Sequence, residues 1–325
     1  MMKNIVEKFS GIKVLVVGDI MIDAYLFGKV DRISPEAPVP VVAVNKKENR
    51  LGGAANVALN LVSLGAKPIL CSVIGDDKDG HEMIALLDQS NIGTNGIVKS
   101  SERITTVKTR VIAQNHQMLR IDSEITKQLN VSDSDNLVKK VSELLKDADV
   151  LVFEDYDKGV LSENNIQQII SKATELNVPV AVDPKKKNFL FYKGATLFKP
   201  NLKELREGFN HHIDIEDKIS FEAIIKKLMN EMCLKNLFVT MSEHGVMITD
   251  GNKYEYVPAH LRKIADVSGA GDTVISVAAL CLALKLPNKI IAEISNLAGG
   301  LVCEEVGVVP IDKKILQQEI IDLKL

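Results

Sequence analysis

The sequence has no surplus of positive charge. Its 325 residues include 40 lysines and arginines against 43 aspartates and glutamates, which gives a net charge of −3 with neutral histidines. The net charge therefore gives no reason to expect that the protein binds nucleic acid. The cysteines are few and scattered, without a Cys-X-X-Cys pair: they are Cys71, Cys233, Cys281 and Cys303. This pattern argues against disulfides and zinc sites and predicts reduced thiols in a cytoplasmic setting.

A long hydrophobic run is also lacking. The longest apolar stretch, residues 274–286, is too short to cross a bilayer, and residues 1–10 lack the apolar core of a secretory signal. With 46% hydrophobic and 26% charged residues, the composition is that of an ordinary globular protein. We therefore predict a soluble protein without a membrane partner.

Several familiar motifs are missing as well. The sequence contains no GxxxxGK[ST] loop, no strand–GxGxxG–helix fingerprint, no GxSxG elbow and no HExxH pair. Phosphate chemistry in this protein would need another kind of anion site.

The sequence does contain a Gly-rich turn, Asp266-Val-Ser-Gly-Ala-Gly-Asp272, followed by an apolar run that predicts a buried helix. Small residues let the backbone approach a ligand, and the free N–H groups and positive dipole end of a helix start bind anions. The local pattern leaves two interpretations of Asp272. It caps the helix, as Asp often does, or it is a base beside a bound phosphate.

Buried strands alternate with helices along most of the chain. Apolar runs at residues 13–17, 67–73, 149–153, 178–182 and 237–239 predict strands of a mostly parallel sheet. Several of these runs end in polar residues, and ligands bind at the carboxyl ends of such strands. We predict an α/β fold in which three layers, helix, sheet and helix, form a single domain over residues 1–325.

Two segments depart from this alternation, and we predict that they form a small β lid at about residues 25–45 and 104–122. In the first, Gly28 and three prolines exclude a helix, while valines favour an extended edge segment. The second alternates between apolar and polar residues, which predicts a half-exposed antiparallel ribbon with Lys108, Arg110 and Arg120 on its polar side. These cations either protect a sheet edge or bind an anionic substrate.

Five motifs together resemble those of the ribokinase-like (phosphofructokinase B) sugar kinase family. They are Gly52-Gly53-Ala-Ala-Asn56, Asp183-Pro-Lys185, Asn201-Leu-Lys-Glu204, Thr240-Met-Ser-Glu-His-Gly245 and the turn ending at Asp272. Their order and spacing are similar to the family's over essentially the whole chain. The resemblance implies the three-layer ribokinase-like fold, sugar phosphorylation, and ATP and Mg²⁺ as cofactors.

Three further strings are similar to those of the kinases of heptose 7-phosphate. They are Gly18-Asp-Ile-Met-Ile-Asp23, Arg32-Ile-Ser-Pro-Glu-Ala-Pro-Val-Pro-Val41 and Glu154-Asp-Tyr-Asp-Lys-Gly159. This resemblance implies ATP-dependent phosphorylation of D-glycero-D-manno-heptose 7-phosphate at O1, on the route to ADP-heptose and the lipopolysaccharide core. Because such kinases often continue into a nucleotidyltransferase domain, which this chain lacks before Leu325, we expect the stand-alone kinase form.

Two alternatives stay open. One is a kinase for another sugar or sugar phosphate, of the fructokinase or ribokinase type, although a neutral sugar would not need Lys108 and Arg110. The other is a non-catalytic sugar-binding regulator, which would show a damaged site, whereas Gly269, Gly271 and Asp272 are all present.

The resemblance also implies roles for individual residues. Asp272 would deprotonate the sugar hydroxyl, and the amides of Gly269, Ala270 and Gly271 would bind the transferred phosphoryl group. The ATP and Mg²⁺ site would comprise Asn201, Glu204, Thr240, Ser242, Gly245, Ser268 and Asn296, with Glu204 acting on the metal through water. The sugar phosphate would contact Asp23, Gly52, Gly53, Asn56, Lys108, Arg110, Arg120, Asp155, Lys158 and Lys185. The lid would close over the sugar and pair with a second copy in a homodimer.

Overall fold

A nine-stranded sheet runs through the part of the chain that the computed structural model describes, residues 4–114, 116–211, 213–260 and 262–323. Its strand order is β13-β12-β11-β10-β9-β8-β1-β4-β5. Seven strands from β11 to β5 pair in parallel: β11 (Asn236–Thr240), β10 (Leu197–Phe198), β9 (Val180–Asp183), β8 (Val150–Glu154), β1 (Lys13–Gly18), β4 (Lys67–Gly75) and β5 (Gly93–Ser100). Five of them lie in the predicted runs, whereas β10 and β5 were not predicted. The antiparallel edge strands β12 (Val246–Thr249) and β13 (Tyr254–Val257) were not predicted.

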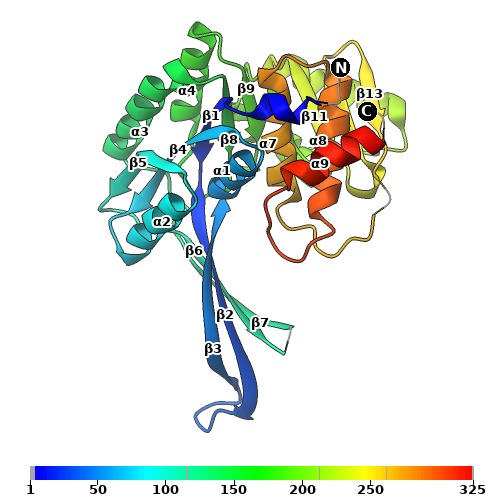
Figure 1. Cartoon of the computed structure of the whole chain (residues 1–325). Helices are drawn as coiled ribbons and strands as arrows, with labels where there is room; N and C mark the ends of the chain where they lie inside the picture. The colour runs from blue at the N-terminus through cyan, green and yellow to red at the C-terminus, as the bar shows by residue number, and fades with distance from the viewer. Residues whose placement is uncertain (1–3, 115, 212, 261, 324–325) are drawn as a thin grey trace.

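Each face of this sheet has its own hydrophobic core. Alternate side chains of β1 enter opposite cores, since Val14 and Val16 pack on one face and Leu15 and Val17 on the other. The first core is covered by α1 (Ala54–Ser63), α2 (Lys78–Gln89), α7 (Ala270–Ala283), α8 (Asn288–Val302) and α9 (Lys313–Asp322). The second is covered by α3 (Val131–Leu144), α4 (Glu163–Glu175), α5 (Leu202–Phe209) and α6 (Lys218–Met232). The three-layer α/β prediction is confirmed (Figure 1).

Short 3₁₀ helices complete the secondary structure of the described chain. They are η2 (Val6–Phe9), η3 (Leu145–Asp147), η4 (Phe189–Phe191) and η5 (Ser242–His244). No helix in the described ranges is both long and apolar enough to cross a membrane.

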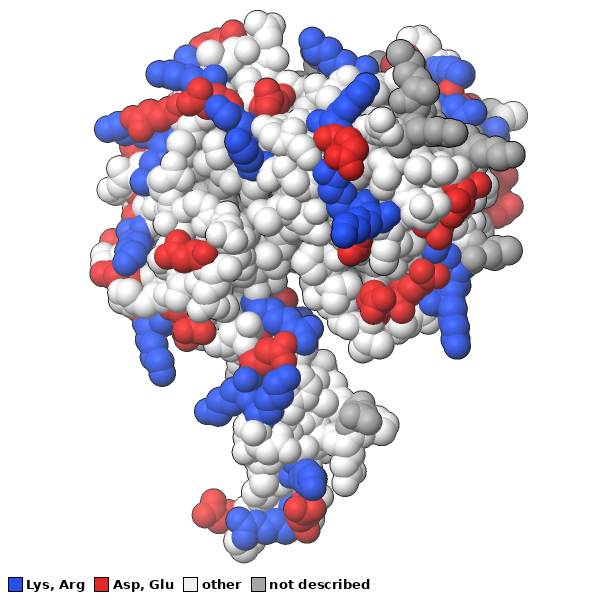
Figure 2. All heavy atoms as spheres, viewed as in Figure 1, with Lys and Arg blue, Asp and Glu red and all other residues white. Residues whose placement is uncertain are grey.

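A second, four-stranded sheet projects from the body, and we call it the arm (Figure 1). Strand β2 (Ile20–Ile33) pairs antiparallel with β3 (Pro40–Gly53) and parallel with β6 (Val107–Ala113), which pairs antiparallel with β7 (His116–Ser123). The predicted lid segments lie in the arm, but β2 and β3 extend farther toward the body than residues 25–45. Figure 2 shows lysines and arginines gathered with acidic side chains at both the root and the tip of the arm.

Candidate active site

Asp272 lies in the first turn of α7 and is only 6% exposed. Its carboxylate is held at both oxygens. Asn56 Nδ2, from the first turn of α1, donates to Oδ2 at 2.6 Å, and the Tyr156 hydroxyl, from the loop after β8, donates to Oδ1 at 2.9 Å. Three segments that are far apart in the sequence therefore meet at this carboxylate.

These hydrogen bonds decide between the two interpretations of Asp272, a helix cap or a base. A capping Asp accepts a hydrogen bond from a backbone N–H of its own helix, but both oxygens of Asp272 accept from side chains. The N-cap position belongs to Gly269, with φ of 81° and no side-chain cap. The capping interpretation is therefore wrong. The carboxylate is directed into the site, as a base would be.

The start of α7 offers free backbone donors to an anion. Gly271 is exposed, and its N–H and that of Asp272 form no hydrogen bond to any described residue. The N–H of Ala270 donates to Val267 O at 3.3 Å. This helix start can bind an anion directly beside Asp272.

Burial raises the pKa of the Asp272 carboxyl to about 6. The negative charge of Asp183 acts in the same direction, whereas the hydrogen bonds from Asn56 and Tyr156 favour the ionised form. A carboxyl with a pKa of about 6 is ionised at neutral pH and still basic enough to take a proton from a hydroxyl group that is losing it.

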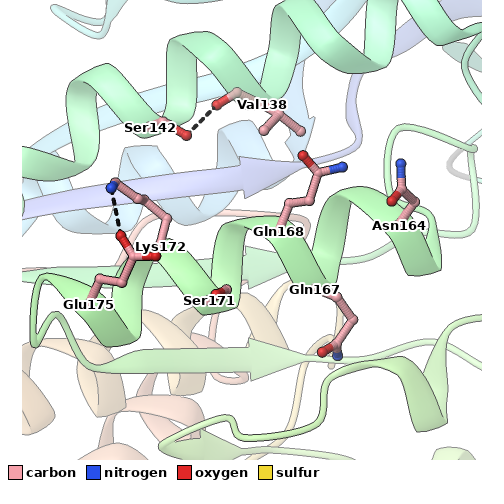
Figure 3. A pocket seen from close by; sticks show the side chains of 8 residues that line it. All are labelled: Val138, Ser142, Asn164, Gln167, Gln168, Ser171, Lys172 and Glu175. Atoms are coloured by element: carbon pink, nitrogen blue, oxygen red, sulfur yellow. Dashed lines mark hydrogen bonds and ion pairs between the residues drawn. The ribbon is translucent and has the colours of Figure 1, made fainter.

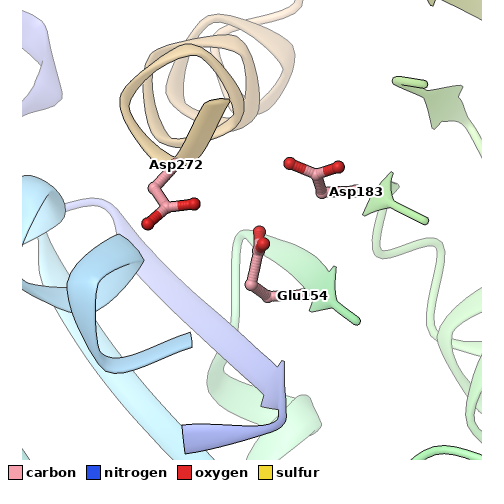
Figure 4. A group of neighbouring side chains, drawn as sticks. All are labelled: Glu154, Asp183 and Asp272. Atoms are coloured by element: carbon pink, nitrogen blue, oxygen red, sulfur yellow. The ribbon is translucent and has the colours of Figure 1, made fainter. Parts of the chain in front are cut away.

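Glu154 and Asp183 complete an acidic group with Asp272 (Figure 4). They end the adjacent strands β8 and β9, where they are paired in register, and one carboxylate oxygen of each of the three residues lies within 4.8 Å of the others. Both oxygens of Glu154 and Oδ1 of Asp183 are buried without a hydrogen bond to any described residue. Burial, with the charges of Asp183 and Asp272, raises the pKa of Glu154 well above its usual range. Such unpartnered oxygens fit a hard cation such as Mg²⁺.

Two lysines face this acidic group. Lys199 is almost fully buried and its Nζ lies 2.9 Å from Asp183 Oδ2, while Lys185 Nζ lies 3.8 Å from Asp183 Oδ1 and also pairs with Glu204. Although burial favours the neutral amine, the charges of Asp183 and Glu204 raise the pKa of Lys199. A Cβ at Gly271 would lie 3.9 Å from Lys199 Nζ, so this cation reaches the anion-binding start of α7.

Asn201 and Glu204 form a capping box at the start of α5. Asn201 Oδ1 accepts from the Glu204 N–H at 2.8 Å, and Glu204 Oε2 accepts from the Asn201 N–H at 2.9 Å. Thr240 lies beside them because it bridges to Asn201 in parallel register. With Oε1 paired to Lys185, each oxygen of Glu204 already has one partner.

Of the remaining predicted nucleotide residues, Gly245 and Asn296 lie beside residues 257–259. Ser242 and Gly245 form a tight turn with φ of 52° and 81°, and a Cβ at Gly245 would lie 2.1 Å from Val257 O. Asn296 Nδ2, in α8, donates to Pro258 O at 2.8 Å. Ser268 is exposed in the Gly-rich turn. The structure thus brings Gly245 and Asn296 together, but no side-chain hydrogen bond joins either of them to Asp272.

Three of the predicted sugar residues, Asp23, Gly52 and Arg110, meet at the root of the arm. A Cβ at Gly52 would lie 2.4 Å from Asp23 Oδ2, and Asp23 pairs with Arg110. The other predicted cations nearby have carboxylate partners. On the arm, Lys108 lies 3.2 Å from Asp122 and 3.4 Å from Glu124, and Arg120 lies 2.9 Å from Asp122. In the loop after β8, Lys158 lies 2.8 Å from Glu124.

The prediction for Asp155 is corrected. This side chain is fully buried, and its carboxylate accepts from Asn188 Nδ2 at 2.9 Å, the Tyr192 hydroxyl at 2.7 Å and the Asp157 N–H at 2.8 Å. Its role is to shape the loop after β8. The neighbours on either side, Glu154 and Tyr156, reach Asp272 instead.

Sequence reasoning assigned no role to Glu154, Tyr156 and Lys199. A signal existed for Glu154, because it directly follows a predicted strand, where ligands bind. Lys199 follows β10, a strand that was not predicted. Tyr156 had none, since only the fold directs its hydroxyl at Asp272.

Surface hollows lie elsewhere. One of about 450 Å³ lies between α3 and α4 and is lined mostly by polar side chains (Figure 3). Another of about 370 Å³ lies between α6 and the β12–β13 turn. Neither hollow is lined by a residue of the Asp272 group.

Comparisons with known proteins agree with this geometry. The model of the pfkB family of carbohydrate kinases matches residues 12–314. The chain is 42% identical over 296 residues to the bifunctional protein HldE of Campylobacter curvus and 41% identical over 308 residues to that of Methylobacillus flagellatus. These matches cover 91% and 94% of the chain but only 62% and 63% of the relatives, so the chain spans less than two thirds of their length.

Solved structures share the fold. Phosphofructokinase-2 from Escherichia coli, in complex with potassium, has a TM-score of 0.80 at 19% identity, covering 97% of this chain and all of that one. Ribokinase from Arabidopsis thaliana, complexed with ribose and ATP, has a TM-score of 0.73 at 16% identity, covering 95% and 98%. At such identities the likeness concerns the fold alone.

Proposed function

The chain belongs to the pfkB family of carbohydrate kinases and is an ATP-dependent sugar kinase, and from that premise we propose that it phosphorylates D-glycero-D-manno-heptose 7-phosphate at O1. The observation that carries the reaction is the placement of Asp272, a buried carboxylate with a pKa of about 6 beside the free amides of α7. A base and an anion site are what phosphoryl transfer to a hydroxyl group needs from the protein.

In the proposed reaction Asp272 takes the proton of the O1 hydroxyl. O1 forms a bond to the γ-phosphorus as the bond from that phosphorus to the bridging oxygen breaks, and the bond's electron pair leaves with ADP. The backbone amides of the turn at residues 269–271 stabilise charge on the transferred group, and Lys199 adds a fixed positive charge. Asn56 and Tyr156 keep the carboxylate aimed at the hydroxyl.

Mg²⁺ would be held by Glu154 and Asp183, whose unpartnered oxygens fit it, with Glu204 acting through water. When bound, the ion neutralises charge on the ATP phosphates. We propose the remaining ATP contacts for Asn201, Thr240, Ser242, Gly245, Ser268 and Asn296.

Two observations support heptose 7-phosphate as the acceptor. The strings around Asp23, Arg32 and Glu154 are similar to those of heptose 7-phosphate kinases, and the arm brings cations to the site, which a neutral sugar would not need. The relatives at about 40% identity are named bifunctional, and this chain covers the part of them that matches the kinase family. We place the reaction in the cytoplasm, where ATP is supplied.

The decisive variant is Asp272→Asn, which keeps the shape and removes the base. Turnover of heptose 7-phosphate should fall by about 10²–10⁴-fold, the usual contribution of a general base, while ATP binding stays close to wild type. The assay is ADP release with heptose 7-phosphate, fructose and ribose as acceptors, and ATP binding is measured by calorimetry. Faster turnover of fructose or ribose by the wild type would reject the substrate, and unchanged turnover in the variant would reject the base.

A further inference from the structure

Two arginines flank one aromatic ring at the root of the arm. The Arg50 guanidinium, from β3, lies 4.8 Å from the centre of the Tyr25 ring, and the Arg110 guanidinium, from β6, lies 5.4 Å from it. In the sheet Arg110 is directly opposite Tyr25, and Arg50 is opposite Asp23, two residues away. The three side chains therefore share one face of the arm.

Both guanidinium groups have donors to spare. Arg50 Nε donates to Glu48 Oε1 at 2.6 Å, and Arg110 uses Nη1 for Asp23 and, at 3.5 Å, for Lys108 O. Both Nη atoms of Arg50, and Nε and Nη2 of Arg110, form no hydrogen bond to any described residue. A guanidinium has five N–H donors in a fixed fork, so each arginine can still bind an oxyanion with two bonds.

The two arginines lie next to residues that border the proposed site. Asp23, the partner of Arg110, lies against Gly52, and a Cβ at Gly307 would lie 3.2 Å from Arg50 Nη1. The Gly307 N–H donates to Asp266 Oδ2 at 3.1 Å, at the start of the Gly-rich turn. Strand β3, which carries Arg50, also runs directly into α1, whose Asn56 binds Asp272.

The two arginines form ion pairs with different carboxylates from those of the other predicted cations nearby, since Arg50 pairs with Glu48 and Arg110 with Asp23. Lys108 and Arg120, with Lys158 from the loop after β8, share Asp122 and Glu124, and Lys108 contacts both acids. Arg50 shares Glu48 with Lys46, so this face has fewer carboxylates than cations. A phosphate monoester, with a charge of about −1.5 to −2 at neutral pH, complements such a surplus.

We propose that Arg50 and Arg110 bind the phosphate group of a sugar phosphate, at the end remote from the hydroxyl group that Asp272 deprotonates. The Tyr25 ring keeps the two guanidinium groups in place by cation–π contact on the shared face. This inference rests on the proposed function, and it makes the arginine pair the feature that distinguishes a sugar phosphate from a neutral sugar.

The test compares Arg50→Met with Lys46→Met, a control on the same strand and face whose cation also lies over an aromatic ring, that of Phe27 at 5.3 Å. Binding of heptose 7-phosphate, fructose 6-phosphate and ribose 5-phosphate, each with its unphosphorylated parent sugar, is measured by calorimetry without ATP. Steady-state turnover is measured in parallel. Arg50→Met should weaken binding of the preferred sugar phosphate about ten- to a hundred-fold, with the parent sugar, the KM for ATP and kcat nearly unchanged. Arg50→Lys should recover only part of the loss.

The outcomes separate this inference from the proposed function. If the wild type prefers another sugar phosphate and Arg50→Met loses that preference, heptose is rejected as the substrate and the arginine pair is kept. If the wild type turns over heptose 7-phosphate and Arg50→Met behaves like Lys46→Met, the arginine pair is rejected and the proposed function is kept. A wild type that binds no sugar phosphate more tightly than its parent sugar overturns the inference.

Discussion

Two buried carboxyls, Asp19 and Asp272, are linked through Tyr156. Asp19 accepts hydrogen bonds from the backbone N–H groups of Tyr156, Lys158 and Val160, which fixes the loop after β8. The hydroxyl group of the same tyrosine then donates to Asp272. Burial raises the pKa of both carboxyls to about 6, and Asp155 adds to the effect on Asp19. The position and the basicity of Asp272 therefore depend on a loop that Asp19 holds.

This link predicts a pH dependence. Asp272 accepts a proton only when ionised, so kcat/KM should rise with pH through about 6 and stay high above it. Tyr156→Phe removes a hydrogen bond that favours the ionised carboxylate, so the pKa of Asp272 should rise further. The acidic limb should move up by about one to two pH units, as expected for a hydrogen bond to a charged group. The measurement is the pH profile of kcat/KM for both proteins.

Tyr192→Phe is the matched control. This change removes a buried hydroxyl group that donates to Asp155. Asp155 lies in the loop after β8, as Tyr156 does, but it forms no hydrogen bond with Asp272. The acidic limb of the kcat/KM profile of Tyr192→Phe should stay at about pH 6, even if the variant is less stable than the wild type. Because Asp19 titrates in the same range, an unmoved limb in Tyr156→Phe would assign the limb to Asp19 and contradict the role given to Asp272.

At the scale of elements, the junction between β3 and α1 sets the geometry of the site. Gly53 has φ of 62° and ψ of −138°, a conformation that only glycine adopts readily, and a Cβ there would lie 2.4 Å from Asp19 O. Because Gly53 has no side chain, β3 can turn into α1 while packing against Asp19, the residue that fixes the loop after β8. This turn is what brings Asn56 to Asp272.

Gly53→Ala should accordingly be strongly destabilising. Gly11 offers a control, because it also has positive φ, at 86°, but a Cβ there would have nothing within 4 Å. Gly11→Ala should lower the free energy of unfolding by about 1–2 kcal/mol, and Gly53→Ala by at least about twice that, since a backbone clash adds to the conformational cost. Urea denaturation of both variants measures the difference. If the two variants lost the same free energy of unfolding, the Asp19 carbonyl would have to move away from the new methyl group at little cost, which would contradict the predicted clash.

At the scale of the whole molecule, the arm is the part that we expect to contact a second copy of the chain. Every residue of β7 is exposed, including Met118 at 44%, Leu119 at 56% and Ile121 at 51%, and β7 is the edge strand of its sheet. An exposed apolar edge strand tends to pair with another chain. This supports the proposed homodimer, in which the arm strands of two copies meet and close over the sugar.

The double variant Leu119→Lys with Ile121→Lys tests this proposal. The two side chains project from the same face of β7, so two charges there should prevent the copies from meeting without disturbing either core. Sedimentation equilibrium should give a dimer for the wild type and a monomer for the variant, with an unchanged circular dichroism spectrum. A monomeric wild type, or a variant that still dimerises, would contradict pairing through the arm.

Local patterns were enough to predict much of this molecule. Apolar runs predicted five of the parallel strands and the helix after the Gly-rich turn, and the alternation around Lys108 and Arg110 predicted the β6–β7 ribbon. These features depend on neighbouring residues, whose side chains alternate between faces in a fixed way. The motif at residues 266–272 likewise predicted an anion site without any knowledge of the sheet order.

The partners of the site residues depended on the tertiary structure. Tyr156 and Asp272 are 116 positions apart, and Asn56 and Asp272 are 216 apart, yet each pair shares a hydrogen bond. Glu154 meets Asp183 because β8 and β9 are neighbours in the sheet. Burial and charge act through space, so the strand order decides which carboxyl has a raised pKa and which cations already have a partner. For that reason, motifs along the chain predict the kind of reaction, and only the packed sheet shows which side chains lie together at the candidate site.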